Sequence, residues 1–292
     1  MKRPKDIWTA SRFKAYHTCP MKEAYRYRYK LAPVSSRPAL AFGTAIHKGI
    51  EMWSLEAALE ALNMPFPMTQ EDADEQETVK VTVTALLNGY MNKYLPFEKH
   101  EPEKMFSLPI RSTNGRSSTK MVISGKIDDI AYINGECWIV EYKTASRLDS
   151  TYFDRLYVDT QITTYMMAAL RMGYKPVGVL YRVLRKPSLK RGKTESIVQH
   201  LNRIEADISA RPEHYFEERK LYRSSDGILS FEHQLYQETK LANDLYKKGC
   251  VYKHSTSCSM YGRCEYLPLC MKEAGAGALF EYREPHEELR EE

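Results

Sequence analysis

The chain has 292 residues, of which 43% are hydrophobic and 28% are charged, and its formal net charge is +5. This is the composition of an ordinary globular protein, and the mildly basic charge suits a polyanionic partner without requiring one. No apolar run approaches the roughly 20 residues that span a bilayer, which excludes a membrane-spanning helix. The N-terminal segment MKRPKDIWTASRF has basic residues with no apolar stretch behind them, so we expect a cytoplasmic protein without a membrane partner.

The predicted elements begin with a helix that ends near residue 30 and takes Ser11 as its N-cap. Its basic residues alternate with tyrosines, a pattern that can bind phosphates and stack on bases but that a solvated helix face explains equally well. A second helix is expected over 44–62, where apolar residues keep helical spacing. Prolines and the acidic stretch 71–77 should break this pattern, and a third helix is expected over 78–94.

A β section follows these helices. A short strand is expected over 105–110, and the alternating runs ISGKIDDIAYI and ECWIVEYKT flank Asn134-Gly135. Asn-Gly between two alternating runs is a strong hairpin signal. A helix is then expected over 150–172, a buried strand over 177–184, and helices over 195–210 and 231–248.

The hairpin is predicted to gather charged side chains. Counting away from the turn, Asp128 faces Glu141, and Lys126 faces Lys143. Because side chains alternate along a strand, Asp128, Glu141 and Lys143 should emerge on one face of the sheet.

Two opposed carboxylates repel each other unless a positive charge lies between them. Hard oxygen ligands suit Mg²⁺ or Mn²⁺, so a divalent cation is the expected partner of Asp128 and Glu141. Lys143 would be near enough to hold an attacking water or to offset charge on a phosphate. The alternative is an exposed polar patch, which explains the polarity but not the opposed like charges beside a lysine.

These residues resemble a known family. Gly125-Lys-Ile-Asp128 followed by Glu141-Tyr-Lys143 resembles the motif pair of PD-(D/E)xK nucleases. The segments Gly43-Thr-Ala-Ile-His47 and Gln161-Ile-Thr-Thr-Tyr165 are similar to the Gly-x-x-x-His and Gln-x-x-x-Tyr motifs of the RecB-like branch. That branch includes the RecB and AddB nuclease domains, CRISPR adaptation nucleases and phage exonucleases. Each motif is weak alone, but their order is specific.

The resemblance implies a role for each matching residue. It implies that the metal is bound by His47, Asp128, Glu141 and the backbone carbonyl of Tyr142. It makes Lys143 the catalytic lysine, acting with the acids Asp128 and Glu141. It also implies that Gln161 and Tyr165, four residues apart on one helix face, position the nucleic acid. An imidazole ligand favours Mn²⁺, although Mg²⁺ is more abundant in cells.

Six cysteines are present, and four of them lie between residues 250 and 270. The cluster-containing relatives use one N-terminal and three C-terminal cysteines, which implies a 4Fe–4S cluster on Cys19, Cys258, Cys264 and Cys270. The interval between Cys258 and Cys264 is longer than in the usual pattern, which leaves Cys250 or His254 as alternatives to Cys258. Zinc is the less expected metal because short paired spacings are absent, and unligated cysteines are a further alternative. Cys137 is expected to be an ordinary core residue.

The expected fold is α/β, a restriction-endonuclease-like α-βββ-α-β core with a helical subdomain joined by the N- and C-terminal cysteines. The nuclease core would occupy 36–185, with a helical insertion at about 63–100. Residues 1–35 and 186–280 would form the helical and iron–sulfur subdomain, and 281–292 an acidic tail. A cluster joining these distant segments would constrain the unfolded chain, so we expect its role to be structural.

The expected function is hydrolysis of phosphodiester bonds by a metal-dependent DNA exonuclease. The substrate would be single-stranded or end-processed DNA in recombination, repair or phage DNA metabolism, with the host cytoplasm as the location if the protein is phage-encoded. A non-catalytic DNA-binding or assembly module that retains the RecB-like fold is the main alternative, and a zinc-containing structural protein is a weaker one. No Gly-x4-Gly-Lys-[Ser/Thr] loop is present, so a separate helicase or recombination protein would supply any ATP-driven step.

Overall fold

A mixed β-sheet forms the centre of the computed structural model, which describes residues 5–34, 38–62, 64, 69–260, 262–286 and 289. The sheet has six strands in the order β1-β4-β5-β6-β7, with β3 pairing along the other edge of β4. Its strands are β1 (Asp6–Trp8), β3 (His100–Arg111), β4 (Ser117–Ile133), β5 (Glu136–Ala145), β6 (Pro176–Arg185) and β7 (Phe216–Leu221). Strands β2 (Leu31–Pro33) and β8 (Phe280–Tyr282) form a separate antiparallel pair.

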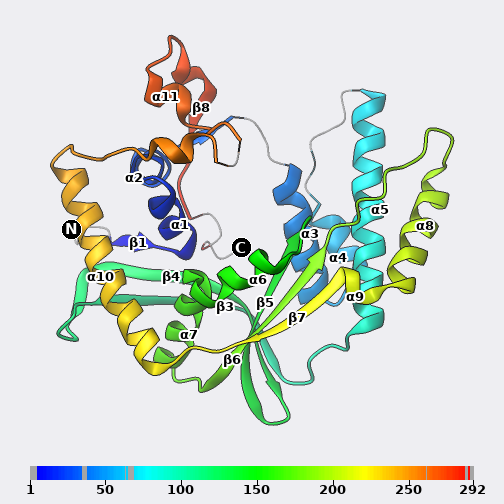
Figure 1. The fold of residues 1–292 in the computed structure, drawn as a ribbon, viewed down its shortest axis with the longest axis horizontal. Coiled ribbons are helices and arrows are strands. Elements are labelled where there is room, and N and C mark those ends of the chain that lie inside the picture. Colours follow the sequence, from blue (N-terminus) through cyan, green and yellow to red (C-terminus); the bar gives the residue numbers. More distant parts are fainter. Residues whose placement is uncertain are drawn as a thin grey trace.

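Helices cover both faces of this sheet (Figure 1). The longer ones are α1 (Ala10–Thr18), α3 (Pro38–Glu51), α5 (Gln70–Lys93), α7 (Thr160–Arg171), α8 (Ile197–Ala210) and α10 (Ser225–Lys247). The shorter α-helices are α2 (Pro20–Glu23), α4 (Leu55–Glu60), α6 (Ser150–Asp154), α9 (Pro212–Tyr215) and α11 (Leu267–Met271). Single turns of other helix types are η1 (Ala24–Arg28), η2 (Arg155–Val158), η3 (Ser255–Cys258) and η4 (Ala276–Leu279).

Two hydrophobic cores lie against the two faces of the sheet. One contains Phe13 of α1, Met166 of α7 and Phe231 of α10. The other contains Ile46 of α3 and Leu86 of α5, together with residues of α4 and α8. The chain order of helix, β3–β5, helix and β6 is the α-βββ-α-β order expected from the sequence, and β1 and β7 extend the sheet beyond it.

The β4–β5 hairpin forms where the sequence predicts it. Asn134 and Gly135 both have positive φ, 52° and 82°, as a type I′ turn requires. The predicted register is confirmed from Ile133–Glu136 to the pair Asp129–Val140, where the ladder ends. The predicted pairs Asp128–Glu141 and Lys126–Lys143 are not part of this ladder, because β4 separates from β5 beyond Asp129 and its edge at residues 121–123 pairs with β1.

The helix boundaries differ in part from the prediction. Thr9, not Ser11, caps α1, because its side chain accepts a hydrogen bond from the Arg12 amide. The acidic stretch that was expected to break a helix lies in the first turns of α5, where a capping box of Thr69 and Asp72 begins the helix. Carboxylates near a helix N-terminus are stabilised by the helix dipole, so the acidic residues Glu71 and Asp72 favour the start of α5.

Three long predicted helices are each interrupted. The one that ends near residue 30 is split at Cys19, whose extended backbone separates α1 from α2 and η1. The one over 44–62 is split into α3 and α4 at Trp53, whose φ is 47°. The one over 150–172 is split into α6, η2 and α7, because Asp159 leaves the helical conformation and caps α7 through its side chain.

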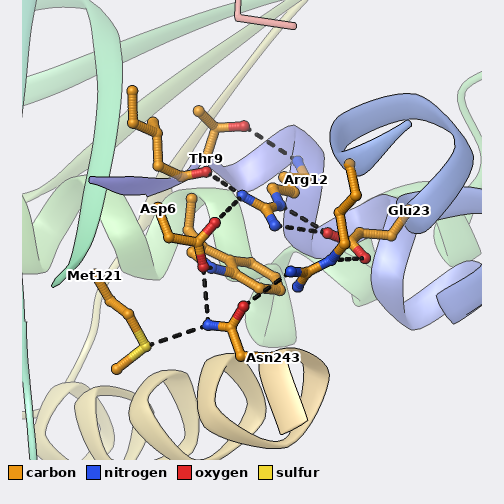
Figure 2. Close-up of polar contacts among 9 residues, drawn as sticks. Asp6, Thr9, Arg12, Glu23, Met121 and Asn243 are labelled. Atoms are coloured by element: carbon orange, nitrogen blue, oxygen red, sulfur yellow. Dashed lines mark hydrogen bonds and ion pairs between the residues drawn. The ribbon is translucent and has the colours of Figure 1, made fainter. Parts of the chain in front are cut away.

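The N-terminal segment is anchored by a buried charge network (Figure 2). Arg12, 3% exposed, forms ion pairs with Asp6 and Glu23. Asn243 of α10 donates to Asp6 and accepts a hydrogen bond from Arg28. These contacts connect β1, α1 and α2 to a helix more than two hundred residues away in the chain.

The N- and C-terminal segments pack together. Besides the β2–β8 ladder, the Tyr266 hydroxyl donates to the Leu31 carbonyl, and Lys22 forms an ion pair with Glu265. The Tyr266 ring also stacks on Tyr25. In Figure 1 the two segments lie together at one end of the molecule, above the sheet. Among the described residues, no helix is both long and apolar enough to cross a membrane.

Candidate active site

The site predicted from the sequence lies where β4 separates from β5. On one side β4 is covered by β3, and on the other it pairs with β1 at residues 121–123 and with β5 at residues 129–133. On this second edge of β4, residues 124–128 therefore lie between the segment paired with β1 and the segment paired with β5. Asp128 occupies the end of this interval, next to the point where the β4–β5 ladder begins.

The side chain of Asp128 takes the place of a strand partner at this point. Its Oδ2 atom accepts a hydrogen bond of 2.9 Å from the backbone N–H of Tyr142. His47 of α3 also approaches, with its Nδ1 atom 3.6 Å from the same oxygen. The structure thus brings His47 and Asp128 together across some eighty residues of sequence, as the motif resemblance implied.

Glu141 is almost completely buried, with 1% of its surface exposed. Its Oε1 atom is bound to the Lys143 ammonium, and its Oε2 atom has no hydrogen-bond partner among the described residues. Burial raises the pKa of Glu141, the nearby Asp128 charge raises it further, and Lys143 opposes the shift. The predicted clustering of Asp128, Glu141 and Lys143 is therefore present, and it leaves one carboxylate oxygen unsatisfied.

Lys143 is held by the Glu141 carboxylate. Burial would lower the pKa of Lys143, but Glu141 and Asp128 outweigh burial and raise it. The lysine is therefore cationic at neutral pH. A cationic ammonium fixed beside two acids can bind an anionic substrate group or orient a water.

The donor set fits a hard divalent cation. Two carboxylates and an imidazole are ligands for Mn²⁺ or Mg²⁺, and the unsatisfied Oε2 of Glu141 is a buried acceptor that a cation would satisfy. In the parts of the chain that the structure describes, no three His, Cys, Asp or Glu side chains stand close enough to form an assembled cation site. In this structure the Glu141 carboxylate is paired with Lys143, and the Asp128 carboxylate accepts from the Tyr142 amide.

Tyr142 faces the site with its backbone, whose amide donates to Asp128. Its side chain belongs to the core on the other face of the sheet, where its ring lies edge-on to Tyr90. The expected ligand role of the Tyr142 carbonyl is compatible with this orientation, since only the backbone of Tyr142 faces the site.

Gln161 and Tyr165 lie beside the acids. The Gln161 amide donates to the Tyr165 hydroxyl at 2.9 Å, which confirms that the two residues share a face of α7. Tyr165 is buried, and its pKa is raised by desolvation and by the charges of Glu141 and Asp128. The pair is thus close enough to the acidic groups to act on a ligand bound there.

Three further charged residues border the site: Glu103, Lys126 and Glu51. The sequence did not identify them as site residues. Glu103 lies in β3 between the ladder pairs Pro102–Asp129 and Lys104–Ile127, and it forms an ion pair with Lys126. Burial raises the pKa of Glu103, and the charges of Asp128 and Glu51 raise it further, although Lys126 opposes the shift. One signal was available: Glu51 follows His47 by four residues and so shares its helix face.

The four cysteines of the predicted cluster lie in the N- and C-terminal segments that pack together, but among the described residues no three Cys, His, Asp or Glu side chains stand close enough to hold a metal ion. Cys19 accepts a hydrogen bond from the His254 amide at its sulfur, and Cys264 donates through its amide to the Cys258 carbonyl. Burial raises the pKa of Cys270, to which the nearby Cys19 and Cys264 contribute. Cys137 is buried in the core, as predicted.

The two alternatives to Cys258 differ in position. Cys250 is exposed, and its thiol donates to the Lys248 carbonyl. His254 lies beside Cys19, but its ring Nδ1 faces the Thr18 carbonyl at 3.1 Å. His254 is thus near the cysteines, whereas Cys250 is turned toward its own helix end.

The profile of the PD-(D/E)XK nuclease superfamily matches residues 7–271. No curated protein matches the chain significantly. The fold is similar to that of a candidate exonuclease from Eubacterium rectale, with 12% identity and a TM-score of 0.48, over 91% of this chain and 87% of that one. It is also similar to SSO0001, with 12% identity and a TM-score of 0.32, over 82% of this chain and 92% of that one. Neither likeness is close enough to carry an argument about activity. Because the superfamily match spans nearly the whole chain, including every residue of the predicted site, this chain belongs to the PD-(D/E)XK nuclease superfamily of metal-dependent phosphodiester hydrolases.

Proposed function

We propose that this chain is a Mg²⁺- or Mn²⁺-dependent DNA exonuclease of the RecB-like branch, acting on single-stranded or end-processed DNA in recombination, repair or phage DNA metabolism. The observation that carries the proposal is the buried Glu141 carboxylate, bound to Lys143 on one oxygen and unsatisfied on the other, beside Asp128 and His47. A purely structural role would not require a carboxylate with a buried, unpaired oxygen.

In this proposal His47, Asp128, Glu141 and the Tyr142 carbonyl hold the metal. When bound, a divalent cation lowers the pKa of a water and stabilises charge on a phosphate. Lys143 orients the attacking water and offsets the charge that develops on the phosphate. Asp128 is kept in place by the Tyr142 amide, so its carboxylate needs little rearrangement to bind an ion.

Gln161 and Tyr165 position the DNA strand in this scheme. Their mutual hydrogen bond fixes the Gln161 side chain next to the acids, where its amide can reach a phosphate or sugar oxygen. A separate helicase or recombination protein would deliver single strands or free ends.

We further propose that Cys19, Cys258, Cys264 and Cys270 bind a 4Fe–4S cluster with a structural role. Thiolates are the ligands of such clusters, and here one comes from the N-terminal segment and three from the C-terminal segment that packs on it. The cluster would add a further link between two segments that the β2–β8 pair, backbone hydrogen bonds and side-chain contacts already join. Zinc is the less favoured metal for this site.

An assay with end-labelled DNA tests the nuclease proposal. Single- and double-stranded substrates, each linear and circular, are incubated with Mg²⁺, with Mn²⁺ or with EDTA. We expect linear DNA to be shortened from its ends when metal is present, and circular DNA and EDTA samples to remain intact. Cleaved circles would contradict the exonuclease assignment. Binding of DNA without cleavage under any metal would favour the non-catalytic alternative.

A further inference from the structure

The turn between α6 and α7 exposes two large apolar side chains. Tyr157 is 67% exposed and Val158 is 79% exposed, whereas the preceding Leu156 is 2% exposed and packs in the core. All three residues belong to η2. The side chains therefore change from buried to exposed between Leu156 and Tyr157.

This turn is fixed on both sides. Arg223 donates to the carbonyl of Leu156 at 2.6 Å and to the hydroxyl of Thr163 at 2.9 Å. On the α7 side, Asp159 accepts hydrogen bonds from two backbone amides of that helix. Tyr157 and Val158 are therefore held in solvent by a rigid support, not by the freedom of a loose loop.

The turn also lies next to the candidate active site. Asp159, two residues after Tyr157, is close enough for its charge to act on both Glu141 and Lys143. On the α6 side, the Tyr152 hydroxyl bonds to that of Tyr181 at 2.8 Å, and Tyr181 is the β6 partner of Glu141. Figure 1 shows α6 near the ends of β5 and β6, and Tyr152 and Phe153 of α6 pack against the core that contains α7.

Charged residues of both signs flank the turn, and one arginine lies close to the exposed pair. Arg155 precedes the exposed pair by two residues and stacks its guanidinium on the Tyr152 ring, 4.3 Å from the centroid. Arg147, before α6, has an exposed side chain that forms an ion pair with Asp149 at 2.8 Å. The exposed Tyr157 offers a face for a base, and Arg155 offers a cation for a phosphate beside it.

We propose that Tyr157, with Val158 beside it, is a stacking subsite for an unpaired nucleobase of the DNA strand whose phosphate lies at Glu141 and Lys143. The inference rests on the proposed nuclease function. Tyr157 stacks on the base, and Val158 fills the space beside it, which prevents that base from returning to its neighbour. Because every base has a π-face, the subsite favours single strands or frayed ends without selecting a sequence.

The test compares Tyr157→Ala with Tyr157→Phe, and Val158→Ala with Val198→Ala. Val198 is a matched control, since it is 64% exposed and lies on α8, away from this turn. Steady-state cleavage of single-stranded DNA gives KM and kcat. Fluorescence of a 2-aminopurine oligonucleotide, measured with EDTA present, reports base stacking without cleavage.

We expect Tyr157→Ala to raise KM by about 5- to 100-fold, the effect of losing one stacked base, with a smaller change in kcat. It should also abolish the quenching of 2-aminopurine at one position of the oligonucleotide. Tyr157→Phe should keep both wild-type properties, Val158→Ala should weaken them partly, and Val198→Ala should have no effect.

The outcomes separate the two proposals. Cleavage by the wild type with KM and quenching unchanged in Tyr157→Ala would overturn the stacking subsite and leave the nuclease function intact. Absence of cleavage in the wild type would overturn the function, and the quenching measurement would still decide the subsite. A loss in Tyr157→Phe equal to that in Tyr157→Ala would show that the hydroxyl matters, which contradicts stacking.

Discussion

The Asp128 carboxylate accepts a hydrogen bond from the Tyr142 backbone amide at 2.9 Å. Asp128 lies one residue beyond the last backbone pair of the β4–β5 ladder, Asp129–Val140. The side chain thus replaces the main chain of β4 as the partner of β5. Because this happens at the point where β4 leaves β5, the carboxylate is directed into the space that His47 and Glu141 also face. The same contact satisfies the amide and fixes a proposed metal ligand.

Lys143→Ala should abolish cleavage, and circular dichroism checks the fold because the change leaves the buried Glu141 without its partner. The variant removes the cation that binds Glu141, and loss of one group that stabilises a transition-state charge lowers kcat by at least about a hundredfold. Cleavage of end-labelled DNA measures the effect, and DNA binding by fluorescence anisotropy should change little. Lys220→Ala on the edge strand β7 is the control and should cleave normally. Retained cleavage in Lys143→Ala would remove this lysine from the mechanism.

Asp128→Asn should weaken metal binding without unfolding the protein. An asparagine oxygen can still accept from the Tyr142 amide, but the ligand loses its charge. Replacing residues that merely support a ligand weakens metal binding about 10- to 100-fold, so the Kd for Mn²⁺ should rise by at least that much in calorimetry.

The neighbouring residue provides a matched control. Asp129→Asn removes the same charge from a carboxyl that faces His100 instead, at 2.8 Å. Its Mn²⁺ affinity should stay near that of the wild type. Equal losses in Asp128→Asn and Asp129→Asn would indicate a general electrostatic effect instead of a ligand.

Arg12→Met should destabilise the whole fold. The change leaves the carboxylates of Asp6 and Glu23 without their shared partner, and removing one member of a buried ion pair costs about 3–5 kcal/mol. The free energy of unfolding from urea titration measures the loss. Arg203→Met, at an exposed pair with Glu195, should leave the urea midpoint almost unchanged. Equal midpoints for the two variants would show that the network of Figure 2 is not a stabilising anchor.

Stability should fall in acid through Asp6. Burial alone would raise the pKa of Asp6, but Arg12 and hydrogen bonds from Asn243 and Trp8 hold it below its usual value. A carboxyl with a lowered folded-state pKa stabilises the protein above its unfolded pKa, about 3.9, and this stabilisation is lost as pH falls through the folded-state value. Urea midpoints measured from pH 6 downward should therefore drop more in the wild type than in Asp6→Asn. Parallel curves would exclude Asp6 as a source of acid sensitivity.

Cysteine substitutions test the cluster. After anaerobic purification, the wild type should be brown with broad visible absorption and contain iron. Cys264→Ser should lose both, because it removes one of the thiolates near Cys270. Cys250→Ser should keep them, since this exposed thiol faces its own helix end. A colourless wild type containing zinc would overturn the iron–sulfur proposal. Loss of colour in Cys250→Ser would show that Cys250, in place of Cys258, is a ligand of the cluster.

Local sequence patterns were sufficient for much of the fold. The Asn134-Gly135 turn fixed the hairpin register, because few residues tolerate the positive φ that its two positions require. Spacing of apolar residues located α8 and β6 closely. The same patterns missed β1 and β7, which have three and six residues. Strands this short have little periodicity, and they exist because β4 and β6 offer them free edges.

The sequence by itself determined which residues could form the site, through Asp128, the Glu141–Lys143 pair and the four-residue spacing of Gln161 and Tyr165. Only the tertiary structure decided that His47 reaches Asp128, that Glu141 is buried with one oxygen unsatisfied, and that the turn at Tyr157 is fixed in solvent by Arg223. Periodicity along a chain reports which side of an element a residue occupies. Distances between elements, and the burial that shifts a pKa, depend on how those elements pack, and no local pattern contains them.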